Sequence, residues 1–401
     1  MIVIADFGAS LKHTHHGSSI RAFVNLARTR SDIVVLLPIH SELTAFDLGC
    51  EPEEVKYCLL PSSHRSKFRK NVLLNLFPVI FDKLATFASA SRQFWILKVL
   101  IFISNVRLEA TLKSFLLKDP RKEVRLLFPT TCPLAIGFSE RFVKKNSDVR
   151  NLERVCLRLT NTAENRGSFA GTNNIETLTT NLLLYNNSSV FIGFEMEEYF
   201  HSLPELKALA FHSPFPCPNS WTCSDTRSLD KLTFSFLGFP KSIKGITNIS
   251  EIVTRVNKVC GRKISWIIQI TNDENPTWDN LLSQENISLL KGKISSEKMM
   301  DSIYRSDYLV LPYDPSHYRR NASAMAYLAA EQLKPVLTLT GSAFANEVEK
   351  FSIGLVYPSI DKLIEGIKKI VEGESRINSD DIVRYNTYRN NSNLRFLGLD
   401  S

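Results

Sequence analysis

Short apolar runs alternate with helix-like stretches along most of the chain. In the first half the runs cover residues 2–6, 33–37, 124–128, 155–159, 190–194 and 208–211. In the second half they cover 232–237, 264–270, 289–290, 308–311, 336–339 and 355–357. Brief apolar runs separated by helical stretches are typical of parallel strands joined by crossover helices. The pattern therefore predicts an α/β protein throughout.

The composition changes between residues 213 and 230, where the sequence reads SPFPCPNSWTCSDTRSLD. Polar stretches rich in proline favour a linker over a buried element. A chain of 401 residues is also too long for one ordinary core. We therefore predict two doubly wound, Rossmann-like domains in tandem, 1–217 and 218–401. The second includes a C-terminal tail, from Ser379 onward, that begins helix-like and is frayed at its end.

The charge of the chain favours anionic partners. The formal net charge is +8, within a composition typical of soluble globular proteins. Zinc-finger cysteine spacing, an RNP-like aromatic motif and a long basic tract are all missing from the sequence, so no nucleic-acid partner is expected. Seven scattered cysteines favour reduced thiols and therefore a cytoplasmic location. The apolar start without a charged leader predicts no signal peptide, and no apolar segment is long enough to predict a spanning helix.

Residues 62–81 combine a basic segment with an apolar one. Arg65, Lys67, Arg69 and Lys70 directly precede the sequence NVLLNLFPVIF. One interpretation is a core helix with a solvated basic flank. The other is peripheral contact with an anionic membrane, at its inner face.

Residues 308–341 read as strand, loop, helix and strand. Asn321 or Ser323 can cap a helix over residues 322–333, and Arg319 and Arg320 lie in the loop before it. On parallel sheets, ligands bind beyond the carboxyl ends of strands, where helix N-termini present unpaired amides. This stretch therefore predicts a diphosphate-binding site, unless the two arginines are simply solvated loop charges.

A histidine-rich loop, SLKHTHHG, follows the first apolar run. It places His13, His15 and His16 at the carboxyl end of the first predicted strand. No Cys, Asp or Glu joins them at ligand spacing, so we expect no metal site. A general base or a substrate-binding group fits better, because histidine titrates near neutral pH. An exposed polar loop without a task is the alternative.

The run DYLVLPYDPSHYRRNASAMAYLAAEQLKPV resembles the donor-site segment of GT-B-type glycosyltransferases. In that segment a strand ending in Leu-Pro-Tyr precedes a Tyr-x-x-Arg-x-Ser turn, a helix and a Lys-Pro-Val strand. Three further segments agree with it: LGFPKSIKG, ISSEKMMDSIYRSD and the HHG loop. The resemblance covers most of the second half and, more weakly, the first.

The resemblance implies the GT-B architecture, with an acceptor-side first domain, a donor-binding second domain and a cleft between them. The implied reaction is metal-independent transfer of a sugar from a nucleoside-diphosphate sugar to a saccharide or lipid-linked acceptor, without a cofactor, in surface or exopolysaccharide biosynthesis. The sequence contains no Asp-x-Asp motif, which agrees with metal-free chemistry. The implied diphosphate-binding residues are Lys244, Arg319, Arg320, Ser323 and, more weakly, Lys241. The donor pocket takes Gly238, Tyr313 and Tyr318, and the base or acceptor-binding residue is His15 or His16, facing the diphosphate across the cleft.

One departure concerns the donor ribose. Many GT-B enzymes carry two carboxylates eight positions apart, which fall here on Arg320 and Leu328. Glu331 lies three residues further on and would take the ribose role in a different helix register. Two alternatives follow: a non-catalytic, GT-B-like sugar-binding or partner protein, and a sugar-nucleotide epimerase on the same fold.

Overall fold

The chain folds into two compact units. The first is Met1–Pro216 with Asn390–Ser401, and the second is Cys217–Arg389. The predicted boundary lies one residue from this division. The computed structural model describes residues 1–6, 15–38, 41–58, 106, 108–117, 119, 121–130, 135, 138–139, 141–143, 151–160, 189–198, 210–217, 231–238, 240–270, 284–375 and 377–400.

The first unit is built on a seven-stranded parallel sheet with the order β3-β2-β1-β4-β5-β6-β7. Its strands are β1 (Ile2–Ala5), β2 (Ile33–Pro38), β3 (Val55–Cys58), β4 (Val124–Phe128), β5 (Leu152–Leu159), β6 (Val190–Phe194) and β7 (Ala210–His212). Its helices are α1 (His15–Ala27), α2 (Ala45–Leu48) and η1 (Pro52–Glu54), together with the helical residues 108–117.

Both faces of this sheet carry a hydrophobic core. Apolar residues of α1, α2 and the end of the chain pack on one face, around Ile4 and Val35. Apolar residues of 108–116, together with Phe138, Phe142 and Val143, pack on the other, around Val3 and Leu126. Side chains of successive strand residues point to opposite faces, so these nearly continuous apolar strands are explained by a sheet that is covered on both sides.

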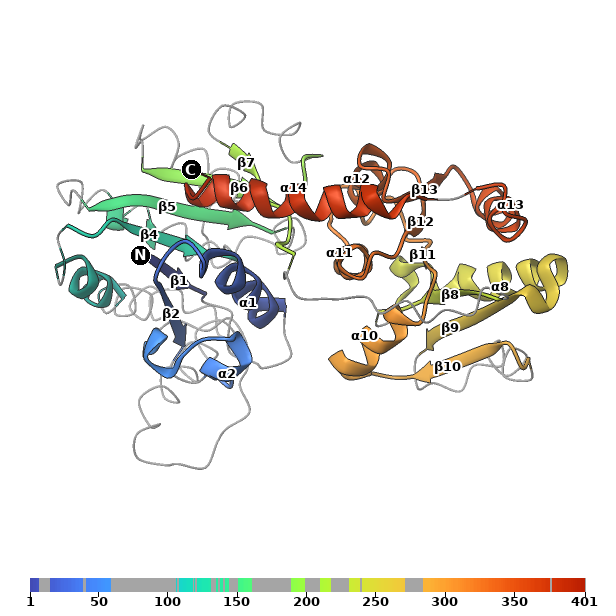
Figure 1. The fold of residues 1–401 in the computed structure, drawn as a ribbon, viewed down its shortest axis with the longest axis horizontal. Helices are drawn as coiled ribbons and strands as arrows, with labels where there is room; N and C mark the ends of the chain where they lie inside the picture. Colours follow the sequence, from blue (N-terminus) through green and yellow to red (C-terminus); the bar gives the residue numbers. More distant parts are fainter. Residues whose placement is uncertain are drawn as a thin grey trace, which may run out of the picture. The chain divides into compact units, whose positions relative to one another are not determined.

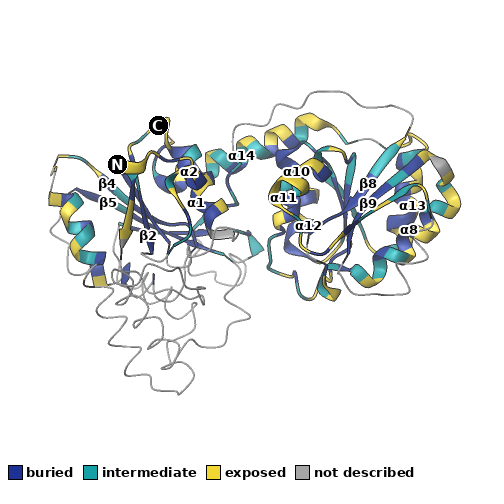
Figure 2. Ribbon diagram, turned by 90° about the horizontal axis from the view of Figure 1, so that it is seen from below, coloured by how far each residue is buried: buried dark blue, intermediate teal, exposed yellow. Residues whose placement is uncertain are grey.

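The second unit repeats this arrangement with a six-stranded parallel sheet of order β10-β9-β8-β11-β12-β13. Figure 2 shows α8 and α13 on one face of it and α10, α11 and α12 on the other. The strands are β8 (Leu232–Phe236), β9 (Ile264–Ile270), β10 (Ile287–Lys291), β11 (Tyr308–Leu311), β12 (Val336–Leu339) and β13 (Gly354–Tyr357). The helices are η5 (Ser242–Lys244), α8 (Ile246–Cys260), η6 (Gly261–Lys263), α10 (Ser296–Tyr304), α11 (Ala324–Glu331), α12 (Ala343–Lys350) and α13 (Ile360–Val371). The helix α14 (Ser379–Leu397) begins in this unit and ends in the first.

The C-terminal tail differs from the sequence prediction. The helix α14 starts at Ser379, as expected, but it continues to Leu397 without a frayed end, and the last twelve residues belong to the first unit (Figure 1). Phe396, Leu397 and Leu399 are buried there, and the Cys156 thiol donates to the Phe396 carbonyl at 3.3 Å. Burial of this apolar end explains why the tail is ordered despite its many asparagines and arginines.

Two further local predictions change. The predicted loop SLKHTHHG is shorter than expected: α1 starts at His15, so His15 and His16 occupy the first turn of a helix and not a loop. The glycine after them marks close packing: a Cβ at Gly17 would lie 2.9 Å from a methyl group of Leu43. The edge strand β3 was not predicted, because Lys56 and Tyr57 are exposed and the strand lacks an apolar run.

The segment 62–81 and His13 lie outside the described residues. Among the helices that the structure does describe, none is long and apolar enough to span a membrane.

Candidate functional site

The candidate site lies at the carboxyl ends of β8 and β11. These strands are neighbours, and the strand order reverses between them, which is where doubly wound sheets bind their ligands. The loops that follow them touch: the Asp314 amide donates to the Ile243 carbonyl at 3.0 Å. Gly245 has φ +76°, and a Cβ on it would lie 2.1 Å from the Pro312 carbonyl oxygen. Only glycine permits this contact between the two loops.

Lys244 ends η5 within this contact and is half-buried. Its ammonium nitrogen lies 5.9 Å from the centre of the Tyr313 ring. Burial and the charge of Lys241 lower the pKa of Lys244. Among the described residues, no carboxylate or hydrogen-bond acceptor pairs with this ammonium. A partly desolvated cation without a counter-charge is costly, so its position favours an anionic ligand.

Helix α11 begins beside Lys244. Ser323 is its N-cap, 3% exposed, and its hydroxyl accepts from the Ala326 amide at 3.3 Å. A Cβ at Gly238, which has φ +96°, would lie 3.0 Å from the Met325 side chain and 3.3 Å from the Lys244 nitrogen. The first amides of a helix lack intrahelical partners and carry the positive end of its dipole. The Lys244 ammonium and the N-terminus of α11 therefore form one positively charged site.

Three other predicted cations lie on the same two loops. Lys241 and Arg319 are exposed, and Arg320 is half-exposed and interacts with its surroundings. Arg319 has no ion-pair partner in the part of the chain that the structure describes. We call Gly238, Lys244, Tyr313, Arg319, Arg320 and Ser323 the switch-point site.

An aromatic cluster supports the loop after β11. Tyr313 and Tyr318 have ring centres 4.7 Å apart, and Phe344 packs edge-on against both, at 5.4 and 5.8 Å. Burial raises the pKa of Tyr318 to about 12, and burial also raises that of Tyr313. Both phenols are therefore neutral near pH 7, and the site keeps its positive charge.

Gln269, which we did not predict, joins two glycine turns beneath the site. It is 2% exposed, at the end of β9. Its side-chain oxygen accepts from the Gly238 amide at 2.9 Å, and its nitrogen donates to the Gly292 carbonyl at 2.7 Å. A polar side chain in an otherwise apolar strand, ISWIIQI, was the available signal.

Glu331 lies at the opposite end of α11 from Ser323 and does not face the candidate site. It forms a buried ion pair with Arg389 of α14 at 3.2 Å, and the two side chains are 3% and 0% exposed. Arg389 also lies 4.7 Å over the Tyr327 ring. Burial raises the pKa of Glu331, and Arg389 opposes that shift. Because this carboxylate holds α14, we do not retain it in the donor pocket.

In the first unit, His15 and His16 begin the helix that follows β1, the strand beside the β1/β4 reversal. Their side chains lie outside the described residues. The described carboxyl edge of this sheet instead carries Arg158, Glu195, Glu197 and His212, none of which we predicted from the sequence.

No protein-family model and no curated protein matches the sequence. Several solved structures share the fold. A UDP-forming alpha,alpha-trehalose-phosphate synthase from Burkholderia xenovorans is 11% identical over 99% of this chain and 98% of its own, with a TM-score of 0.57. HepE from Anabaena in complex with UDP is 10% identical over 99% and 97%, with a TM-score of 0.55.

The apo structure of OtsA is similar at 10% identity over 98% of this chain and 96% of its own, with a TM-score of 0.51. The similarity covers both units, and both have the strand order of a Rossmann-like domain. The chain therefore has the GT-B fold, in which two Rossmann-like domains follow one another along the sequence.

Proposed function

We propose that this chain is a metal-independent glycosyltransferase that moves a sugar from a nucleoside-diphosphate sugar to a saccharide or lipid-linked acceptor. The single observation that carries the proposal is the Lys244 ammonium, which is partly desolvated, has no counter-charge among the described residues and lies beside the start of α11. The fold supports it, because structural neighbours were solved with UDP and with UDP-glucose.

The proposed chemistry follows from where charge develops. As the glycosidic bond to the donor breaks, negative charge accumulates on the leaving diphosphate. Lys244, Arg319, Arg320 and the Ser323-capped helix start would stabilise that charge without a metal, with Lys241 contributing more weakly. Gly238, Tyr313 and Tyr318 shape the donor pocket.

In the first unit, His15 or His16 remains our proposed base or acceptor-binding residue. The proposed pathway is surface or exopolysaccharide biosynthesis in the cytoplasm, with peripheral membrane contact through residues 62–81. Co-sedimentation with anionic liposomes at low salt tests that contact; a chain that stays in solution would contradict it.

Calorimetry with UDP-, GDP-, ADP- and dTDP-sugars tests the function. We expect at least one donor to bind. We also expect release of the nucleoside diphosphate, slowly when water hydrolyses the donor and faster when an acceptor takes the sugar. A chain that binds none of these donors would contradict the proposal.

A second candidate function is a non-catalytic, sugar-nucleotide-binding protein. It is favoured by the engagement of Glu331 with Arg389, together with Leu328 at the position of the usual ribose carboxylate. It predicts donor binding without nucleoside diphosphate release, with or without acceptor. Release above the background of a heat-denatured sample would remove it.

Replacing Gln269 should weaken donor binding. Gln269→Met keeps the length of the side chain but loses both hydrogen bonds, so the Gly238 turn is no longer fixed against Lys244. We expect about tenfold weaker nucleotide binding, from one or two lost buried hydrogen bonds. Calorimetry measures it, with Gln284→Met as the control in the same unit.

A further inference from the structure

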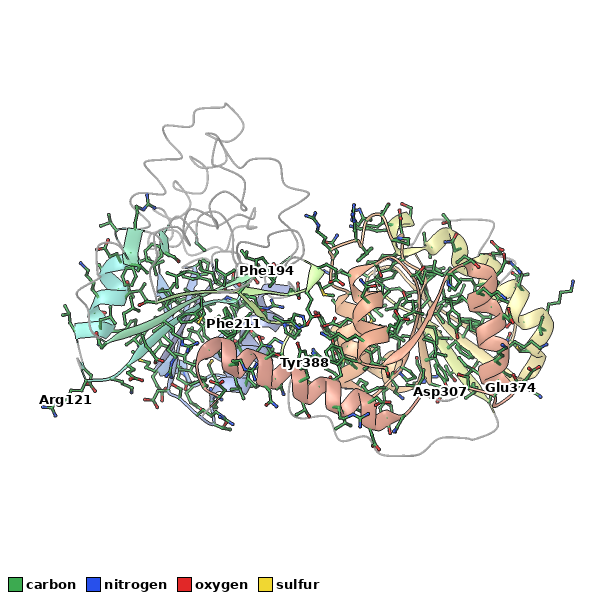
Figure 3. The ribbon with its side chains drawn as sticks, turned by 90° about the horizontal axis from the view of Figure 1, so that it is seen from above. Arg121, Phe194, Phe211, Asp307, Glu374 and Tyr388 are labelled. Carbon is green, nitrogen blue, oxygen red and sulfur yellow. The ribbon has the colours of Figure 1, made fainter. Side chains whose placement is uncertain are left out.

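Helix α11 leads away from the switch-point site with one accessible face. Six of its eight residues are buried. The other two are Ala324, which is exposed, and Leu328, which is half-buried. Residues four apart lie on the same side of a helix, so these two side chains form one face that starts at the helix N-terminus. Figure 3 labels Asp307, which directly precedes β11; the site lies at the opposite end of that strand.

The accessible face of α11 offers no side-chain hydrogen bond, because both of its residues are apolar. The carboxylate of the helix, Glu331, is engaged in the buried ion pair with Arg389. The carboxylate of the loop before the helix, Asp314, accepts from the Ser316 amide at 2.9 Å and from the Ser316 hydroxyl at 2.8 Å, and so closes its own loop. A ligand that lies along α11 therefore meets positive charge at the helix N-terminus and methyl groups one turn further on.

The position of Leu328 corresponds to the ribose of a bound nucleotide. Four residues of a helix rise by about 6 Å, so Leu328 lies one turn beyond the amides proposed to bind the diphosphate. In a nucleoside diphosphate the ribose is joined to its phosphate through one methylene group, so it is the part of the nucleoside that lies nearest to the phosphates. Leu328 also occupies the position where many GT-B enzymes carry the carboxylate that holds the ribose.

An apolar face and a carboxylate select different sugars in the nucleotide. A ribose 2′-hydroxyl that lies against methyl groups loses water and gains no hydrogen bond, which is unfavourable. The CH₂ group at C2′ of a 2′-deoxyribose has no hydrogen bond to lose, and it gains an apolar contact. Only a site that hydrogen-bonds a hydroxyl rejects the analogue without it. The face formed by Ala324 and Leu328 therefore favours the 2′-deoxyribose.

We propose that the donor site does not recognise the ribose 2′-hydroxyl, that Leu328 is the specificity-determining residue, and that the donors include 2′-deoxyribonucleoside-diphosphate sugars. The inference rests on the proposed glycosyltransferase function and deepens it by naming a class of donor. It also gives Leu328 a role in donor choice, so that the missing carboxylate is no sign of lost catalysis.

Calorimetry with nucleotide pairs that differ only in the 2′-hydroxyl tests this inference. The pairs are UDP with 2′-deoxy-UDP, ADP with 2′-deoxy-ADP and GDP with 2′-deoxy-GDP. In the pair that binds best, we expect the 2′-deoxy nucleotide to bind the wild-type chain at least as tightly as the ribonucleotide. A ribonucleotide that binds more tightly than its 2′-deoxy partner overturns the inference. This comparison uses the unaltered chain, so it does not depend on the folding of a variant.

Leu328→Gln adds a hydrogen-bonding side chain at the same place on α11. Glutamine is a good helix former, and its amide can pair with a 2′-hydroxyl. We expect the ratio of the two affinities to shift about tenfold toward the ribonucleotide. Val259→Gln is the matched control, because Val259 is an exposed apolar residue of α8 in the same unit. A ratio that Leu328→Gln leaves unchanged, or that Val259→Gln shifts equally, overturns the role of Leu328.

The same titrations separate this inference from the proposed function. A chain that binds none of these nucleotides contradicts the donor site itself, and with it the proposed transferase. A chain that binds them but prefers the ribonucleotide keeps the donor site and overturns only the inference. Lys244→Met should weaken both members of a pair equally, because Lys244 is assigned to the phosphates and not to the ribose. A change of the ratio in Lys244→Met as large as that in Leu328→Gln would count against Leu328 as the specificity-determining residue.

Discussion

Lys244→Met should weaken nucleotide binding roughly hundredfold. Methionine keeps most of the side-chain volume but removes the desolvated ammonium beside the start of α11. A charge-assisted contact to a diphosphate in a partly desolvated site contributes about 3 kcal/mol, which corresponds to that factor. Calorimetric titration with the best-binding nucleoside diphosphate measures the loss.

Two further substitutions make this result specific. Lys241→Met should cost less than tenfold, because Lys241 is exposed, and Lys258→Met at the exposed end of α8 should cost nothing. Equal losses in Lys244→Met and Lys258→Met would contradict the assignment of Lys244 to the diphosphate.

The pKa of Lys244 predicts the pH dependence of nucleotide binding. This pKa lies below the usual 10.5 in the folded chain, so the ammonium is lost at a lower pH than in an exposed lysine. Binding should weaken as pH rises through that lowered value. Lys244→Arg should retain binding at higher pH, since arginine stays charged.

The same shift predicts how the stability of the ligand-free chain depends on pH. Between the lowered pKa and 10.5, Lys244 carries a proton in the unfolded chain but not in the folded chain. The free energy of unfolding should therefore rise with pH over that range.

Arg389→Ala should be the most destabilising of these substitutions. It leaves the Glu331 carboxylate buried without its cation and removes the contact with the Tyr327 ring. Breaking one side of a buried ion pair costs about 3–5 kcal/mol. Urea unfolding followed by far-UV circular dichroism measures the change in unfolding free energy.

The double variant Glu331→Leu with Arg389→Met should be more stable than Arg389→Ala alone, because no unpaired charge remains buried. Arg255→Ala serves as the surface control: Arg255 pairs with Glu251 and Asp361 on the outside of the fold. Its loss should cost far less stability than the loss of Arg389, because exposed ion pairs contribute little. A double variant as unstable as Arg389→Ala would show that packing, and not charge, holds α14 on α11.

Local sequence patterns predicted most of the strands. The strands at Val124–Phe128, Val190–Phe194, Ile264–Ile270, Tyr308–Leu311 and Val336–Leu339 were predicted with the bounds that the structure has. They are largely buried on both faces, so each reads as a mainly apolar run. The edge strand β3 has no such run and was missed.

The C-terminal helix α14 could not be predicted in full from its composition. Helix α14 buries Ile382, Tyr385, Arg389, Asn393 and Phe396, whose spacing of three and four residues places them on one helical face. Two of these five are polar and are buried only because each has a partner: Arg389 pairs with Glu331, and Asn393 donates to the Pro214 carbonyl at 2.8 Å. A search for apolar periodicity alone therefore predicted a helix-like start and a frayed end.

The sequence by itself determined that the chain is α/β, with two Rossmann-like halves in tandem, and that a basic loop and a Ser-capped helix follow the strand at 308–311. These features depend on neighbouring residues, so the order of residues is enough to predict them. Tertiary structure alone brought Lys244 to the start of α11, joined Gly238 to Gln269, paired Glu331 with Arg389 and set His212 against Glu197. Those contacts join residues on different elements, and only the packing of the elements decides which side chains meet.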